Sequence, residues 1–191
     1  RLREGLPDHV LLVMDSAYAE YVTRNDYRDG KQLVEDFNNV VMTRTFSKIF
    51  ALGGIRLGWA YCPREVADVL NRLRGPFNVS SPAMAAGIAA IRDIAFTDEV
   101  RTHTEKWYKW TKENLIELGL EVPSQVGNFL LVRFPDDPDQ NAEATNEFFR
   151  TRGIIVRRMT EYSLPECLRI TIGKQDEMQK LLITLKEFRK R

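Results

Sequence analysis

Residues 10–18 read VLLVMDSAY, and residues 40–58 read VVMTRTFSKIFALGGIRLG. The first stretch opens with an uninterrupted apolar run, residues 10–14, and the second with a run rich in β-branched residues, residues 40–45. Each run predicts a strand that is buried on both faces, as the strands of a parallel sheet in an α/β protein are. Asp15 follows the first strand, and Ser47 and Lys48 follow the second. Both predicted strands therefore end in polar side chains.

The rest of the chain shows the periodicities of further strands and helices. We predict strands at 55–61, 128–134, 154–157 and 168–172, and helices at 64–73, 83–91, 98–118, 142–150 and 176–189. The long charged helix is of a kind that often links two domains. We therefore expect an α/β fold with a first domain over residues 1–95, a connecting helix over 96–119 and a small α+β domain over 120–191.

The composition is that of an ordinary globular protein. Of the 191 residues, 43% are hydrophobic and 29% are charged, and the net charge is +1. This charge provides no excess of cations to attract nucleic acid or an anionic membrane. The longest weakly charged stretch, residues 76–91, is too short to span a bilayer, and no secretory signal opens the chain. We expect a cytoplasmic protein with neither nucleic acid nor a membrane as partner.

Cysteine and histidine are scarce. Cys62, Cys167, His9 and His103 lie far apart in the sequence. They lack the paired spacing of a zinc site or of a disulfide framework, so we expect no metal site.

The end of the second strand combines an amine with groups that bind anions. Thr45 and Ser47 offer hydroxyl donors, and Lys48 offers an amine. Arg56 follows after two glycines and has a planar guanidinium suited to a phosphate. These residues predict an anion site beside an amine.

The end of the first strand carries Asp15, Ala17 and Tyr18, which are a carboxylate, a small side chain and a phenol suited to a heterocyclic cofactor. Taken with the second stretch, they resemble the class I/II branch of the fold-type I aminotransferases that depend on pyridoxal 5'-phosphate. That family has Asp-x-Ala-Tyr, then Ser-Lys, then Gly-x-Arg-x-Gly. Here these motifs are residues 15–18, 47–48 and 54–58.

The resemblance implies a role for each matched residue. Lys48 would bind the cofactor aldehyde covalently and then act as the base that moves the substrate proton. Asp15 would pair with the pyridine nitrogen, and Tyr18 would donate to the phenolic oxygen of the cofactor. The remaining implied contacts are Ala17 against the ring and Thr45, Ser47 and Arg56 on the phosphate.

Within the family, the chain is most similar to the histidinol-phosphate subfamily, which transfers an amino group between L-glutamate and imidazole-acetol phosphate. The similarity implies that Arg169 binds the carboxylate or phosphate of an amino-acid or keto-acid substrate, here a phosphorylated one. It implies Arg157 as a second anion-binding arginine, although the adjacent Arg158 leaves that assignment open. An aromatic or broad-specificity aminotransferase and a threonine-phosphate decarboxylase are alternatives on the same scaffold.

The resemblance implies the carboxyl-terminal half of a homodimeric enzyme, in which residues 1–95 are the carboxyl-terminal part of the large domain that binds pyridoxal phosphate. We therefore expect this chain alone to be inactive. At the position of Ser16 many relatives have an acidic residue or another small residue, and we expect the Ser16 side chain to point away from the site. A non-catalytic effector-binding module is a further alternative. The presence of Lys48, Asp15 and Tyr18 together favours catalysis instead, because a binding module has no need of the proton-transferring amine.

Overall fold

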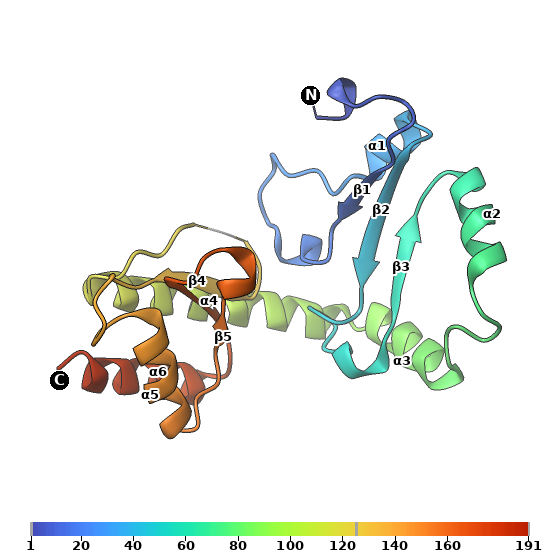
Figure 1. The fold of residues 1–191 in the computed structure, drawn as a ribbon. Helices are drawn as coiled ribbons and strands as arrows, with labels where there is room; N and C mark the ends of the chain where they lie inside the picture. Colours follow the sequence, from blue (N-terminus) through green and yellow to red (C-terminus); the bar gives the residue numbers. More distant parts are fainter. Residues whose placement is uncertain (1, 125, 191) are drawn as a thin grey trace. The chain divides into compact units, whose positions relative to one another are not determined.

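A computed structural model describes residues 2–124 and 126–190 of the chain (Figure 1). These residues form two compact units, one up to Arg101 and one from Thr102. The boundary lies inside the long helix α4 (Ile94–Glu117). The finer division into residues 1–95, 96–119 and 120–191 stays a prediction.

The first unit contains a three-stranded sheet in the order β1-β2-β3 (Figure 1). Its strands are β1 (Leu12–Asp15), β2 (Val40–Thr45) and β3 (Gly58–Tyr61). β1 is parallel to β2, and β3 is antiparallel to it. The carboxyl ends of β1 and β2 therefore lie together, at the edge where β3 begins. All three strands were predicted, but β3 is shorter than residues 55–61, because Gly53–Ile55 form the 3-10 helix η3.

The prediction that β1 is buried on both faces is wrong for the described chain. Leu12 and Met14 contact a small apolar cluster with Val34 of helix α1 (Lys31–Asp36), whereas Val13 is 54% exposed. Successive strand residues point to opposite faces, and the described residues cover only one face of β1. Helix α1 was not predicted, because its six residues are too few to show a helical period.

Two helices follow β3, as predicted. Helix α2 (Arg64–Leu73) begins after Pro63, and helix α3 (Ser81–Arg92) begins after Ser80, whose hydroxyl accepts a hydrogen bond from the Ala83 amide. The small residues of α3 permit close packing on the segment before β3. A Cβ atom on Gly87 would collide with the Leu57 side chain.

The second unit contains an antiparallel sheet in the order β4-β6-β5, two further helices and the part of α4 from Thr102 onward. The elements are β4 (Phe129–Arg133), helix α5 (Ala142–Thr151), β5 (Arg157–Arg158), β6 (Cys167–Thr171) and helix α6 (Gln175–Phe188). One face of the sheet is buried, with Leu130 and Leu168 at 0% exposure, in the same core as Phe149 of α5 and Leu185 of α6. β5 overlaps the predicted strand 154–157 only at Arg157, because only Arg157 and Arg158 pair with β6.

The α/β class of the fold is confirmed. No helix within residues 2–124 and 126–190 has the length and hydropathy of a membrane span. The same residues include no group of three or more His, Cys, Asp and Glu side chains that could hold a metal ion.

Candidate active site

Lys48 lies in the loop that joins β2 to β3. Phe46 and Ile49 on either side of it are buried, at 7% and 0% exposure, and anchor the loop to the core. The Phe46 amide donates to the Leu57 carbonyl, and the Leu52 amide donates to the Phe46 carbonyl, both at 3.0 Å. These contacts hold Lys48, half-buried, beside the carboxyl end of β2.

The structure brings Lys48 and Tyr18 together. The Lys48 Nζ atom lies 5.1 Å from the centroid of the Tyr18 ring. Tyr18 follows β1 directly, after a turn in which the Asp15 Oδ1 atom accepts a hydrogen bond from the Ala17 amide at 3.2 Å. Because β1 and β2 are parallel, residues that follow β1 come beside residues that follow β2. Within the described part of the chain, no carboxylate pairs with the Lys48 amine or cation with the Asp15 carboxylate.

The predicted anion-binding groups surround the same strand ends. The Thr45 hydroxyl oxygen accepts a hydrogen bond from the Ser47 amide at 3.0 Å, which leaves its proton available to a ligand. Thr45 is opposite Gly58 across β2 and β3, so the segment with Arg56 returns beside it. Arg56 is exposed, and one of its nitrogens donates to the Gly53 carbonyl at 2.6 Å. None of the described carboxylates pairs with this guanidinium.

The loop around Lys48 has an unusual backbone. Ala51 and Arg56 have φ angles of 56° and 59°, in the left-handed region that favours glycine. Such residues cost about 1–3 kcal/mol each and cluster at functional sites. Gly58 has no room for a side chain, because a Cβ atom there would lie 2.8 Å from the Arg44 carbonyl oxygen. The shape of this loop is therefore specified closely.

In the second unit, the structure brings Arg157 and Arg169 together. They are directly opposite each other across β5 and β6, and their side chains are therefore on the same face of the sheet. The Arg169 guanidinium carbon lies 5.1 Å from the centroid of the Phe129 ring, and the Nε atom is buried without a hydrogen-bond partner. Among the residues that the structure describes, no carboxylate pairs with Arg169. This pair of arginines is suited to an anion.

Arg158 is on the other face. It is opposite Leu168, which is buried, and its guanidinium pairs with Glu143 at 2.7 Å. The geometry therefore favours Arg157 over Arg158 as the partner of Arg169.

An ionic cluster beside the site was not predicted from the sequence. Arg44 of β2 pairs with Glu20 and with Asp29. The Lys31 amide, which donates to Asp29, and the Arg44 guanidinium hold the pKa of Asp29 below its ordinary value. The sequence did contain a signal for this cluster, because Arg44 lies inside a strand that was predicted to be buried and a buried charge requires partners. Which carboxylates are those partners depends on the tertiary structure.

The chain belongs to the aminotransferase class I and II family, whose pattern residues 6–185 match. It is 55% identical over 188 residues to the histidinol-phosphate aminotransferase of Paramagnetospirillum magneticum and 52% identical to that of Rhodospirillum rubrum. These alignments cover 98% of this chain and 52% and 51% of the two relatives. The solved histidinol-phosphate aminotransferase of Sinorhizobium meliloti, in complex with pyridoxal-5'-phosphate, superimposes with a TM-score of 0.89 at 28% identity, over 98% of this chain and 51% of that structure.

The chain thus spans about half the length of these relatives. Family membership and fold are established for that half. The activity, the substrates and the partners of the whole protein are proposals.

Proposed function

We propose that the protein containing this chain is a pyridoxal 5'-phosphate-dependent aminotransferase of histidine biosynthesis. It transfers the amino group between L-glutamate and imidazole-acetol phosphate, giving 2-oxoglutarate and histidinol phosphate. The observation that carries the proposal is the position of the Lys48 amine, 5.1 Å from the centre of the Tyr18 ring, where β1 and β2 end. The relatives at 52–55% identity support the choice of substrate.

The side chains at this edge fit the cofactor by their chemistry. A protonated pyridine requires a carboxylate, and its ring oxygen requires a phenol. The aldehyde requires an amine, and the phosphate requires the two hydroxyls and the guanidinium. The left-handed backbone at Arg56 and the lack of room at Gly58 specify the loop that carries the phosphate donors. Pyridoxal phosphate, when bound, supplies an aldehyde that combines with primary amines and a ring that accepts electron density from the substrate α-carbon.

The residues of this chain have distinct tasks in the proposal. The Lys48 amine would hold the aldehyde and would be the base that takes the proton from the substrate α-carbon. The Asp15 carboxylate would keep a proton on the ring nitrogen, and the Tyr18 hydroxyl would donate to the ring oxygen. Ala17 would lie at the ring. Thr45, Ser47 and Arg56 would bind the phosphate and keep the cofactor in place.

The second unit supplies groups for the substrate anion. Arg169 and Arg157 share one face of the sheet, and we propose that they bind the phosphate or carboxylate of the substrate. The remaining expectations, a homodimer and a cytoplasmic location, are part of the same proposal.

Trapping with borohydride tests the function. The protein expressed from the complete gene is incubated with pyridoxal phosphate, reduced, digested and mapped. We expect label on Lys48 and its loss in Lys48→Ala. Lys31→Ala is a matched control, because Lys31 is an exposed lysine of the same unit at 3.7 Å from Glu35. Equal labelling of the wild-type protein and Lys48→Ala would refute the proposal.

The reaction is assayed on the same preparation. We expect repeated turnover of glutamate to 2-oxoglutarate, beyond one equivalent per active site, only when imidazole-acetol phosphate is present to accept the amino group. Turnover with aromatic keto acids, or release of carbon dioxide from threonine phosphate, would indicate one of the alternative enzymes instead.

A further inference from the structure

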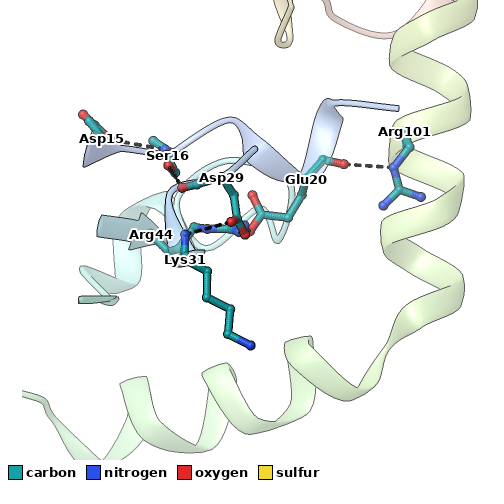
Figure 2. A network of polar contacts seen from close by, with 8 residues as sticks. Asp15, Ser16, Glu20, Asp29, Lys31, Arg44 and Arg101 are labelled. Atoms are coloured by element: carbon teal, nitrogen blue, oxygen red, sulfur yellow. Dashed lines mark hydrogen bonds and ion pairs between the residues drawn. The ribbon is translucent and has the colours of Figure 1, made fainter. Parts of the chain in front are cut away.

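Tyr18 lies in a loop whose two ends are hydrogen-bonded to each other. The loop runs from Ser16, after β1, to Gly30, before α1. The Ser16 hydroxyl donates to the Asp29 carbonyl at 2.7 Å and thereby joins the two ends (Figure 2). Compact surface loops of this kind, with ends close together, often carry functional residues. The Ser16 side chain therefore holds the two ends of the loop together.

Arg44 binds this loop at two points. Its Nη1 atom lies 2.6 Å from Glu20, near the start of the loop, and its Nη2 atom lies 2.5 Å from Asp29, near the end (Figure 2). The Arg44 side chain is only 14% exposed. Its guanidinium carbon also lies 5.9 Å from the ring centre of Trp59, its neighbour across β2 and β3. The arginine thus connects the loop to the central strand of the sheet.

Glu20 is the connection to Tyr18. It lies in the 3-10 helix η2 (Ala19–Tyr21), which begins directly after Tyr18. The Glu20 carbonyl also accepts a hydrogen bond from the Arg101 Nε atom at 2.9 Å (Figure 2). A helical turn held at both the side chain and the carbonyl of Glu20 has little freedom to rotate. Its orientation determines where the Tyr18 ring lies relative to Lys48.

The ionic cluster is poorly built for stability alone. The Arg44 Nε atom and the Glu20 Oε2 atom are buried without hydrogen-bond partners. Partly buried ion pairs with unsatisfied atoms, such as these, gain little free energy over an apolar replacement, but they can specify one arrangement of the chain. The planar arginine fork can bind two carboxylates at once, which a lysine amine cannot do in the same geometry. The contacts are therefore better explained by positioning than by stability.

We infer that Arg44 is a positioning residue for the reaction: by binding Glu20 and Asp29, it holds the loop so that Tyr18 stays against the Lys48 amine. The inference rests on the proposed function, because it assigns Arg44 a task toward the cofactor contact of Tyr18. Arg44 itself acts only through the loop.

The first test needs no cofactor. Amide hydrogen exchange of residues 17–21 is measured in the wild-type protein, Arg44→Gln and the milder variant Asp29→Asn. We expect exchange to be faster by about tenfold, the effect of losing one charged hydrogen bond, in both variants. Arg24→Gln is the matched control, because Arg24 lies in the same loop but pairs only locally with Asp26, with both side chains exposed. We expect no change there.

The second test is a double-mutant cycle on pyridoxal phosphate affinity with Tyr18→Phe. Arg44→Gln should weaken binding about tenfold when Tyr18 is present and have no further effect in Tyr18→Phe. Additive losses would overturn the inference, because Arg44 would then act independently of Tyr18. Unchanged exchange at residues 17–21 in both Arg44→Gln and Asp29→Asn would overturn it as well.

Failure of the proposed function and failure of the inference about Arg44 give different results. If wild-type Lys48 takes up no pyridoxal phosphate, the proposed function fails, and the exchange of residues 17–21 alone decides whether Arg44 holds the loop. If Lys48 is labelled and the exchange is unchanged, only the role of Arg44 fails.

Discussion

Arg157 and Arg169 are directly opposite each other in the antiparallel pair of β5 and β6. Like charges in this relationship destabilise a sheet. Arg157 has a partial counterion in Glu161 at 3.4 Å, whereas none of the described carboxylates pairs with Arg169. An anion bound between the two guanidinium groups would remove the repulsion. The pair is therefore better suited to a ligand than to the stability of the free chain.

The Arg157→Thr variant should weaken substrate binding without lowering the stability of the protein. We expect the melting temperature to stay the same or rise slightly, since the repulsion that is removed amounts to less than about 1 kcal/mol. The KM for the phosphorylated substrate should rise by about tenfold or more, because a charge-assisted hydrogen bond is lost. Thermal unfolding and steady-state kinetics on the complete protein measure the two effects.

Arg158→Thr is the control for this prediction, because Arg158 is the next residue on the same strand and pairs with Glu143 on the other face. We expect an unchanged KM and a loss of stability below about 1 kcal/mol. A larger rise in KM for Arg158→Thr than for Arg157→Thr would reverse the assignment.

Asp15→Asn should affect the chemical step more than the fold. The asparagine oxygen can still accept the hydrogen bond that the Ala17 amide donates to Asp15. The negative charge that would keep the ring nitrogen protonated is lost, so we expect kcat to fall by on the order of 10²-fold or more. Lys48 should still be labelled on reduction. Asp26→Asn is the control, because it makes the same change at an exposed carboxylate that pairs with Arg24, and its kcat should be unaltered. A normal kcat in Asp15→Asn would contradict the role of Asp15 toward the ring nitrogen.

Gly58→Ala should distort the loop that carries Arg56. The added Cβ atom would lie 2.8 Å from the Arg44 carbonyl oxygen, so β2 and β3 must separate locally. We expect a loss of about 1–3 kcal/mol in the free energy of unfolding, together with weaker binding of pyridoxal phosphate. Gly54→Ala in the same segment meets no atom within 4 Å and should leave both unchanged. Denaturant unfolding and cofactor titration compare the two variants, and equal stabilities would contradict the steric account.

Tyr21 should make stability decline at alkaline pH. Burial, together with the neighbouring Tyr18 and Glu20, raises the pKa of Tyr21 to about 12, whereas an unfolded tyrosine has a pKa of about 10. A raised pKa means that the contribution to stability is fully present below about pH 10 and is lost as the pH rises toward about 12. Relative to Tyr21→Phe, the wild-type protein should lose stability as the pH rises from about 10 to about 12. Parallel stability curves for the two proteins over this range would contradict the shift.

Much of this architecture could be predicted from local pattern. The strand at 40–45 and the helix at 64–73 have the predicted bounds, because β-branched runs and the helical period of Val66, Val69 and Leu73 are local signals. The burial of β1 could not be predicted from its own residues. Whether Val13 is covered depends on what packs on that face, which an apolar run does not encode.

The candidate site, like the fold, could be predicted only in part. The family and the chemical types of the groups could be predicted, because Asp15, Tyr18, Lys48 and Arg56 occur in motifs with a recognisable order. Which of these groups meet depends on the tertiary structure. Parallel pairing of β1 and β2 brings Tyr18 to Lys48, the β5–β6 register selects Arg157 rather than Arg158, and the fold of the loop brings Glu20 and Asp29 to Arg44. These contacts join residues far apart in the chain, and their geometry follows from strand register and packing rather than from local sequence.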